Sequence, residues 1–158
     1  MDSLTFRTLL GRFATGVTVV TTNVDGVLHG MTANALSSVS LAPPLLLVCV
    51  DRDTHCHPQL RAAGYFGVSV LASDQQALSN LFARKQEPER GSLRGAAHRL
   101  AEHGVPLLDG ALATMVCRLV ATHPGGDHDI FVGEVLAGQL DDRDPLLFFA
   151  GAYRRLER

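Results

Sequence analysis

The chain has 158 residues, of which 46% are hydrophobic and 19% are charged, a composition typical of a globular protein and not of a disordered one. A chain of this length can bury enough apolar surface to fold without a disulfide or a metal ion, and we expect one domain over residues 1–158. The formal charge of −2 gives no electrostatic basis for binding nucleic acid or an anionic membrane.

The cellular compartment can be inferred from three features of the sequence. The longest apolar run, residues 43–50 (PPLLLVCV), is much shorter than the roughly 20 residues that cross a bilayer. The N-terminal segment contains Asp2 and Arg12 and lacks the pattern of a secretory signal. The three cysteines have no Cys-x-x-Cys spacing and suit reduced thiols. We therefore expect a cytoplasmic protein.

The first elements in chain order are a short helix and a β-hairpin. Ser3 can cap a helix whose apolar residues have helical spacing, and Gly16 is a plausible end for it. Residues 17–22 (VTVVTT) are all β-branched and predict a strand. The strand leads to the turn signal Asp25-Gly26, which predicts a tight hairpin.

The middle of the chain predicts alternating strands and helices. Residues 30–41 (GMTANALSSVSL) form the return strand of the hairpin, and residues 45–50 form a buried strand after two prolines. Residues 57–64 (HPQLRAAG) predict a short helix that ends at a glycine, and residues 65–71 (YFGVSVL) alternate as a strand.

The last third begins with a helix and ends with strands. Ser73 and Gln76 have the spacing of a capping box at the start of the helix. Residues 85–103 are charged, contain Pro and Gly, and predict an exposed loop that covers another part of the protein. Strand patterns return in residues 112–121, 130–136 and 145–150.

Few short helices among about six or seven strands predict an antiparallel barrel or sandwich, and not a parallel α/β sheet. The sequence contains no Gly-x-Gly-x-x-Gly after a strand and no Gly-x-x-x-x-Gly-Lys-[Ser/Thr] motif. Any nucleotide is therefore bound by something other than a Rossmann turn or a P-loop.

Histidine and cysteine clusters suggest two further chemistries, and their spacing argues against both. Residues 55–57 and 123–128 supply side chains that zinc accepts, but neither has the i, i+4 or paired Cys-x-x-Cys spacing of zinc sites, so we expect no metal. A cysteine nucleophile with a histidine partner is the other alternative. Cys49 and Cys117 lie in apolar runs typical of a core, and Cys56 is the only cysteine in a loop-like setting.

Two segments each allow a functional and a structural interpretation. Residues 30–41 combine small side chains with hydroxyls, which lets a flat ligand approach the backbone and lets N–H groups and hydroxyls take phosphate oxygens. The same residues also fit an exposed edge strand. Residues 125–128 (GGDH) can form a hairpin turn, and His128 then stands either at the mouth of a pocket or in a purely structural position.

Six segments taken together resemble one known family. They are, in order, FRTLLGRFATGVTVVTT, GMTANALSSVSLAPPLLLVCVDR, GYFGVSVLASDQQALSNLFA, GVPLLDGALATMVCRL, GGDHDIFVGEV and PLLFFAGAYRRL. Their pattern is similar to that of the flavin reductase-like family, the small reductase components of two-component monooxygenases that exchange flavin by diffusion. The resemblance covers nearly the whole chain.

The resemblance implies a mainly β fold, a six-stranded antiparallel Greek-key FMN-binding split barrel with flanking helices, working as a homodimer. It implies an NAD(P)H:flavin oxidoreductase that reduces FAD or FMN with NADH or NADPH. The reduced flavin would pass to a partner flavin-dependent monooxygenase. Two alternatives remain: a split-barrel flavoprotein that keeps its flavin tightly bound, and a non-enzymatic module that binds flavin or haem.

The resemblance also implies which residues form the site. It places the flavin ring along Gly30, Met31, Thr32, Ala33 and Asn34, and against Cys49, Val50 and Asp51. It places the flavin phosphates near Ala35, Ser37, Ser38, His55 and Cys56, with Phe82 and Lys85 completing the site. It makes His128 the residue that positions the nicotinamide, and it places Tyr153 along the same cleft.

The chain departs from the family pattern near the expected phosphates. Relatives often have Ser or Thr where this chain has Ala35 and Cys56, and a Lys-Phe pair where it has Ser92-Leu93. These departures leave the choice between FAD and FMN open. The family chemistry needs no side chain that acts as an acid, a base or a nucleophile, because the two cofactors carry the reaction and the protein aligns them.

Overall fold

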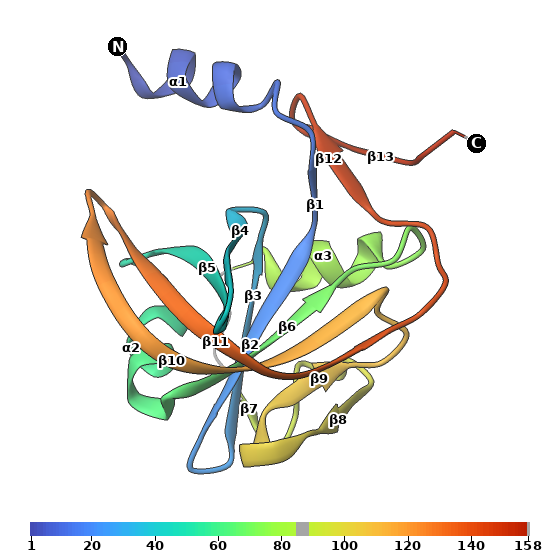
Figure 1. Cartoon of the computed structure of the whole chain (residues 1–158). Helices are drawn as coiled ribbons and strands as arrows, with labels where there is room; N and C mark the ends of the chain where they lie inside the picture. Colours follow the sequence, from blue (N-terminus) through green and yellow to red (C-terminus); the bar gives the residue numbers. More distant parts are fainter. Residues whose placement is uncertain (85–88, 158) are drawn as a thin grey trace.

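A large antiparallel sheet dominates the computed structural model, which describes residues 1–84 and 89–157 (Figure 1). Its strands follow the order β4-β5-β11-β10-β6-β2-β3-β7. The strands are β2 (Thr18–Val24), β3 (Val27–Ala33), β4 (Leu36–Leu41), β5 (Pro44–Asp51), β6 (Tyr65–Val70), β7 (Glu89–Arg90), β10 (Ala113–Gly125) and β11 (His128–Leu140). Since β5 pairs with β11 and not with β6, which follows it in the chain, the strand order contains the crossing connection of a Greek key.

Two smaller sheets and three α-helices complete the described fold. One sheet has the order β1 (Thr15–Gly16), β12 (Leu147–Phe149) and β13 (Ala152–Arg154), and the other pairs β8 (His98–Leu100) with β9 (Pro106–Leu108). The helices are α1 (Ser3–Leu10), α2 (Cys56–Ala63) and α3 (Gln76–Phe82), with a 3₁₀ turn at Glu102–Gly104. None of these helices is long and apolar enough to cross a membrane.

The large sheet curves around a core that its central strands share with α2. Val20, Val48, Phe66 and Phe131 come from four different strands, are all 0% exposed, and pack in one cluster together with Leu60 of α2. The curvature also brings β3 close to β5, although the two strands are not hydrogen-bonded neighbours. The prediction of a mainly β, antiparallel fold with flanking helices is confirmed.

The β2–β3 hairpin has the predicted turn, but its return strand is interrupted. Asp25 and Gly26 have φ values of 51° and 83°, and two positive φ values in a two-residue turn fit the right-handed twist of the strands. Residues 30–41 do not form one strand, because β3 ends at Ala33 and β4 begins at Leu36. β4 lies at the edge of the sheet and is largely exposed, so the edge-strand interpretation holds for this half of the segment.

Two predicted helix caps are wrong, while α2 ends at Gly64 as predicted. In α1 the cap is Asp2 and not Ser3, since the Asp2 carboxylate accepts a hydrogen bond from the Thr5 N–H at 2.9 Å. α1 also ends at Leu10, well before Gly16. Ser73 does not cap α3, because its N–H bonds the Asp144 carbonyl at 2.8 Å and holds this segment against the chain near the C-terminus.

The expected exposed loop over residues 85–103 is only partly a loop. Residues 85–88, including Lys85, lie outside the described residues. Leu93 is 1% exposed and packs with Phe82 in a second core cluster, and β8 pairs with β9. This segment therefore contributes to the core, because a leucine within a polar run anchors it to the barrel.

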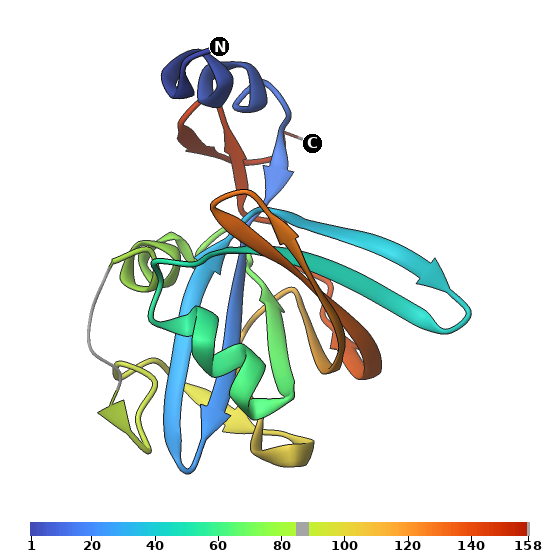
Figure 2. The same cartoon turned by 90° about the vertical axis from the view of Figure 1, so that its left-hand side faces the viewer.

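α1 and the β12–β13 hairpin lie together at one end of the molecule, outside the barrel (Figures 1 and 2). The β4–β5 hairpin also projects from the barrel, and Figure 2 shows it extending to one side. α1 contains no buried residue. The packed barrel and the projecting segments are thus two regions of different character.

Candidate functional site

A pocket of about 130 Å³ lies between β3, the start of α2 and the end of α3, and we call it the β3–α3 pocket. Gly30 lets α3 lie close to β3, because a Cβ at this position would stand 2.8 Å from the Phe82 ring. The Thr32 hydroxyl donates to the Ser79 carbonyl at 2.7 Å and also fixes the helix on the strand. The lining residues are Gly30, Met31, Thr32, Thr54, His55, Cys56, Phe82, Ala83, Arg84 and Arg94.

The wall of the β3–α3 pocket is basic. Arg94 donates to the carbonyls of Leu81 at 2.9 Å and Arg84 at 3.1 Å, and its guanidinium lies 5.7 Å from the centre of the Phe82 ring. Arg84 and His55 also line the pocket, and none of its described lining residues is acidic. A pocket with this charge suits an anion such as a phosphate.

Cys56 also lines the β3–α3 pocket, and its thiol does not act as a nucleophile. It is 4% exposed, and burial raises the pKa of its thiol to about 12. At neutral pH the thiol is therefore protonated, and a thiol in this state is a poor nucleophile. The expectation that Cys56 has a loop-like setting is wrong, since it is the first residue of α2.

A second pocket, of about 180 Å³, adjoins the first and shares Thr32 and Ala83 with it. We call it the Tyr153 pocket. The hydroxyls of Tyr153 and Ser79 are hydrogen-bonded at 2.7 Å, so β13 is held against α3. The lining residues are Val17, Thr32, Ala33, Asn34, Ser79, Ala83, Phe148 and Tyr153. The two pockets together form one continuous surface along β3.

The turn between β10 and β11 lies beside the end of β5. His128 pairs with Asp51 across the two strands, and the Arg52 N–H donates to the Asp127 carbonyl at 3.1 Å. His128 Nδ1 is 2.7 Å from the Asp127 carboxylate, and this hydrogen bond lowers the pKa of Asp127. His128 is half-buried, so its ring is oriented by a neighbour while it stays accessible.

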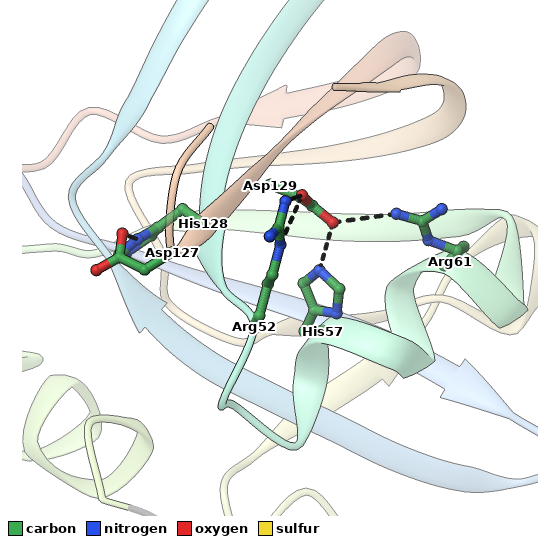
Figure 3. A network of polar contacts seen from close by, with 6 residues as sticks. All are labelled: Arg52, His57, Arg61, Asp127, His128 and Asp129. Carbon is green, nitrogen blue, oxygen red and sulfur yellow. Dashed lines mark hydrogen bonds and ion pairs between the residues drawn. The ribbon is translucent and has the colours of Figure 1, made fainter. Parts of the chain in front are cut away.

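One carboxylate lies at the centre of a polar network next to this turn (Figure 3). Asp129 Oδ1 accepts from Arg52 Nε at 3.0 Å and from Arg52 Nη2 at 2.6 Å. Asp129 Oδ2 lies 2.9 Å from His57 Nε2 and accepts from Arg61 Nη2 at 3.1 Å. The hydrogen bonds from Arg52 and then from His57 lower the pKa of Asp129.

The structure brings together most, but not all, of the residues expected from the sequence. Six expected residues line the β3–α3 pocket: Gly30, Met31, Thr32, His55, Cys56 and Phe82. Three more, Ala33, Asn34 and Tyr153, line the Tyr153 pocket. Lys85 lies outside the described residues.

The other expected residues line neither pocket. Ala35 follows the end of β3, and Ser37 and Ser38 are on the edge strand β4. Cys49, Val50 and Asp51 are at the end of β5, and Val50 is 0% exposed within the core.

Sequence reasoning missed Arg94, Arg84 and Thr54, although one signal for Arg94 was available. A single arginine stands between a leucine and Gly95, in a run otherwise treated as an exposed loop. Because Leu93 is buried, the arginine beside it is held at a fixed place on the pocket wall.

A larger cleft of about 300 Å³ lies elsewhere on the protein, lined by residues that include Arg99, Thr114 and Ala137. It shares no lining residue with the β3–α3 pocket. The Arg99 guanidinium in it already donates to Thr114 Oγ1 at 3.0 Å and to Gln139 Oε1 at 2.7 Å. Size alone therefore does not identify the site, and the residues expected from the sequence favour the smaller pockets.

Comparison with known proteins gives consistent matches over almost the whole chain. Residues 10–157 match the model of the flavin reductase-like domain family. An NADH-dependent flavin reductase from a Rhodococcus species is 46% identical over 159 residues, which cover 98% of this chain and 86% of that protein. The NADH-dependent FMN reductase SmoA of Agrobacterium fabrum is 41% identical over 157 residues, covering 99% of this chain and 88% of that protein.

Solved structures agree with the sequence matches. The flavin reductase component of a bacterial two-component tryptophan halogenase superposes with a TM-score of 0.93 and 43% identity, covering 99% of both chains. The NADH:FAD oxidoreductase of Streptomyces globisporus C-1027 gives a TM-score of 0.93 and 40% identity, covering 99% of this chain and 93% of that one. The latter has also been solved in complex with NAD and FAD fragments, and in that form it gives a TM-score of 0.92.

Proposed function

This chain belongs to the flavin reductase-like domain family, and we propose that it is an NADH-dependent flavin reductase whose one domain spans residues 1–158. It takes up FAD or FMN, reduces it, and releases it to a partner flavin-dependent monooxygenase. The observation that carries the proposal is the β3–α3 pocket, which joins Gly30, Met31 and Thr32 to a basic wall free of acidic residues among those described. Such a wall suits the phosphate of a flavin nucleotide.

The residues of the pocket fit the flavin by their chemistry. Arg94 and Arg84 supply positive charge. Thr54 lies in a backbone turn closed by hydrogen bonds to Asp51 and from His57, beside the neutral Cys56 thiol. Among the described strands, β7 pairs with β3 only at Val27 and Leu28, which leaves the backbone edge of residues 30–33 for a flat ring to approach. We therefore place the phosphate in the β3–α3 pocket and the ring between this pocket and the end of β5.

In this proposal the protein aligns the flavin ring with the nicotinamide of NADH. A bound flavin would supply the ring that accepts a hydride from NADH, and the protein would lower the barrier by holding the two reacting groups in contact. His128 is the residue that we assign to the nicotinamide, since its ring is fixed by Asp127 and remains accessible beside the end of β5. No side chain needs to exchange a proton with either substrate for the transfer.

The protein is proposed to be a homodimer. α1 exposes an apolar surface with no buried residue, and Leu4, Phe6 and Leu9 are 74%, 55% and 54% exposed. Val39 and Leu41 of the projecting β4–β5 hairpin are also exposed. Large exposed apolar areas of this kind mark interaction surfaces in soluble proteins, and a second copy of the chain would cover them.

We also propose a cytoplasmic location. Cys49, Cys56 and Cys117 are free thiols, which suits a reducing compartment.

The function is tested by mixing the purified protein with NADH and a large excess of FAD under anaerobic conditions. Reduction of many FAD molecules per protein is the expected result. Reduction of a single protein-bound equivalent would instead favour a flavoprotein that retains its flavin, and binding without reduction would favour a non-enzymatic module. The same assay with NADPH and with FMN measures the preference for each substrate.

A further inference from the structure

Asp129 connects two segments of the site that are far apart in the chain. It follows His128 directly at the start of β11, so it belongs to the hairpin that carries the proposed nicotinamide residue. Its donors Arg52 and His57 come from the end of β5 and the first turn of α2. Three of the residues that line the β3–α3 pocket lie between these two donors in the chain: Thr54, His55 and Cys56. One carboxylate therefore joins the hairpin to the pocket wall.

The contacts of Asp129 are strong ones. Its side chain is 8% exposed, and it accepts from two guanidinium groups and one imidazole at distances between 2.6 and 3.1 Å. Charge-assisted hydrogen bonds are stronger than neutral ones, and here the carboxylate is shielded from water while the Arg52 and Arg61 side chains are 43% and 58% exposed. The lowered pKa of Asp129, caused first by Arg52, keeps the carboxylate ionised at neutral pH. The network is therefore intact under the conditions in which a cytoplasmic enzyme works.

The backbone around Asp129 does not depend on the carboxylate. Residues 128–134 pair with residues 45–51 along the whole contact between β11 and β5, and Asp129 itself pairs with Val50. An amide in place of the carboxylate keeps the shape of the side chain and the strand pairing. It removes the charge that Arg52 and Arg61 share. The end of β5 and the hairpin are then joined only by backbone hydrogen bonds, and the first turn of α2 can shift relative to the hairpin within an intact barrel.

We propose that Asp129 is a positioning residue for hydride transfer, which fixes the distance between the wall of the flavin pocket and the hairpin that carries His128. The catalytic part of this proposal rests on the proposed function. In this proposal Asp129 contacts neither the flavin nor NADH. It acts through Arg52 and His57, and its loss misaligns two bound substrates without preventing either from binding.

The experiment compares wild type with Asp129→Asn and Glu134→Gln. The second variant is the matched control, because Glu134 forms an ion pair with Arg118 across the β10–β11 hairpin, away from both segments. Stopped-flow measurement at saturating NADH and flavin gives the hydride-transfer rate, and flavin fluorescence quenching gives the Kd. A small misplacement of reacting groups can cost about a hundredfold in rate. We expect Asp129→Asn to slow hydride transfer by about ten- to a hundredfold and to change the flavin Kd by less than about tenfold, with Glu134→Gln near wild type.

A pair of His57 variants isolates one contact of the network. His57→Gln can place an N–H donor where Nε2 now meets Asp129, whereas His57→Leu cannot. Hydride transfer should be slowed by the leucine and largely restored by the glutamine. The His57 ring also packs against the Phe131 ring, with 5.3 Å between the ring centres. If this packing were the only role of His57, the two variants would have the same effect on hydride transfer.

Hydrogen–deuterium exchange tests the network without any flavin. In Asp129→Asn, residues 51–57 and residues 125–129 should lose protection together, while the other strands keep it. Loss of protection in only one of the two segments, or a hydride-transfer rate equal to that of Glu134→Gln, would overturn the proposal. If wild type reduced no flavin, the proposed function would fail, and the exchange measurement would still decide whether Asp129 holds the two segments together.

Discussion

The barrel and the N-terminal helix place similar apolar residues in opposite environments. Phe66 and Phe131 are 0% exposed in the barrel, whereas Phe6 and Phe13 in and after α1 are 55% and 74% exposed. In both regions the sequence has the apolar spacing of its element. The difference shows that the periodicity of the sequence predicts which face of an element is apolar. It does not predict which other part of the protein packs against that face, which only the three-dimensional structure shows. In α1, no residue of this apolar face is buried by the described part of the chain.

The largest expected effect is a loss of stability in the packed core of the barrel. A Cβ at Gly133 would overlap the Phe66 ring and lie 3.0 Å from Cys117 Cβ, and both neighbours are 0% exposed in the core. We expect Gly133→Ala to lower the free energy of unfolding by about 3 kcal/mol, measured by urea denaturation. Gly16→Ala is the control, because a Cβ there has nothing within 4 Å. Equal stability of the two variants would mean that the core around Gly133 is loosely packed.

The second prediction concerns the boundary between barrel and turn, at His128. We expect His128→Ala to raise the KM for NADH and to slow flavin reduction by about ten- to a hundredfold, equivalent to about 1.4 to 2.7 kcal/mol. The flavin Kd should barely change. Stopped-flow kinetics and fluorescence quenching measure the two effects, with the exposed His123 of the same hairpin replaced by Ala as control. Unchanged reduction kinetics would return His128 to a structural role.

The third prediction tests the projecting region. Leu9 is 54% exposed on α1, and burial of a leucine in a dimer stabilises by about 1.5 to 3 kcal/mol. We expect Leu9→Asp to weaken the dimer at least tenfold in analytical ultracentrifugation, and to leave the unfolding of the barrel unchanged. Thr8→Asp introduces the same charge at the neighbouring position and should have a smaller effect. A wild-type protein that is monomeric at micromolar concentration would contradict the proposed dimer.

The smallest effect concerns a buried polar group inside the barrel wall. His29 is 7% exposed, and its Nδ1 has no hydrogen-bond partner within the described residues. Burial, and then the charge of His55, lower the pKa of His29 below 6.5. Because the unfolded chain then binds the proton more readily, this residue costs stability as pH falls below about 6.5.

We therefore expect His29→Leu to be as stable as wild type or up to about 1 kcal/mol more stable at pH 7, with the advantage growing towards pH 5. Thermal unfolding of the flavin-free protein at several pH values measures this. His98→Leu should be destabilising instead, since His98 Nδ1 has a partner in the Ala96 carbonyl at 2.8 Å. A parallel pH dependence of wild type and His29→Leu would contradict the assignment.

The sequence predicted the features of the fold that depend on neighbouring residues. The Asp25-Gly26 turn and the end of α2 at Gly64 are set by backbone conformations that few residues adopt, and both are confirmed. The predicted cap at Ser3 was wrong because the neighbouring Asp2 carboxylate accepts the hydrogen bond instead. The predicted cap at Ser73 was wrong because a contact with a distant part of the chain holds this residue. Ser73 bonds a residue 71 positions later, and no local pattern contains that information.

The same limit applies to the candidate site. Gly30, Thr32 and Phe82 follow from the family resemblance and meet in one pocket. Arg94 was missed despite its position between a leucine and Gly95, because an arginine in a polar run is usually solvated, and no local pattern points to the partners of Asp129. Only the folded structure shows that Arg94 lines the β3–α3 pocket and that Asp129 bonds residues next to it.

The most direct test of the account asks which pocket binds the flavin. Ala83 lies on both the β3–α3 and Tyr153 pockets, and Ala137 lies on the larger cleft, and both alanines are exposed. Ala83→Phe and Ala137→Phe therefore add the same bulk to the two candidate locations, and fluorescence quenching measures the flavin Kd of each folded variant. The account predicts that Ala83→Phe weakens FAD and FMN binding by more than about tenfold and that Ala137→Phe binds both as wild type does. Loss of binding in Ala137→Phe, with Ala83→Phe unaffected, would contradict it.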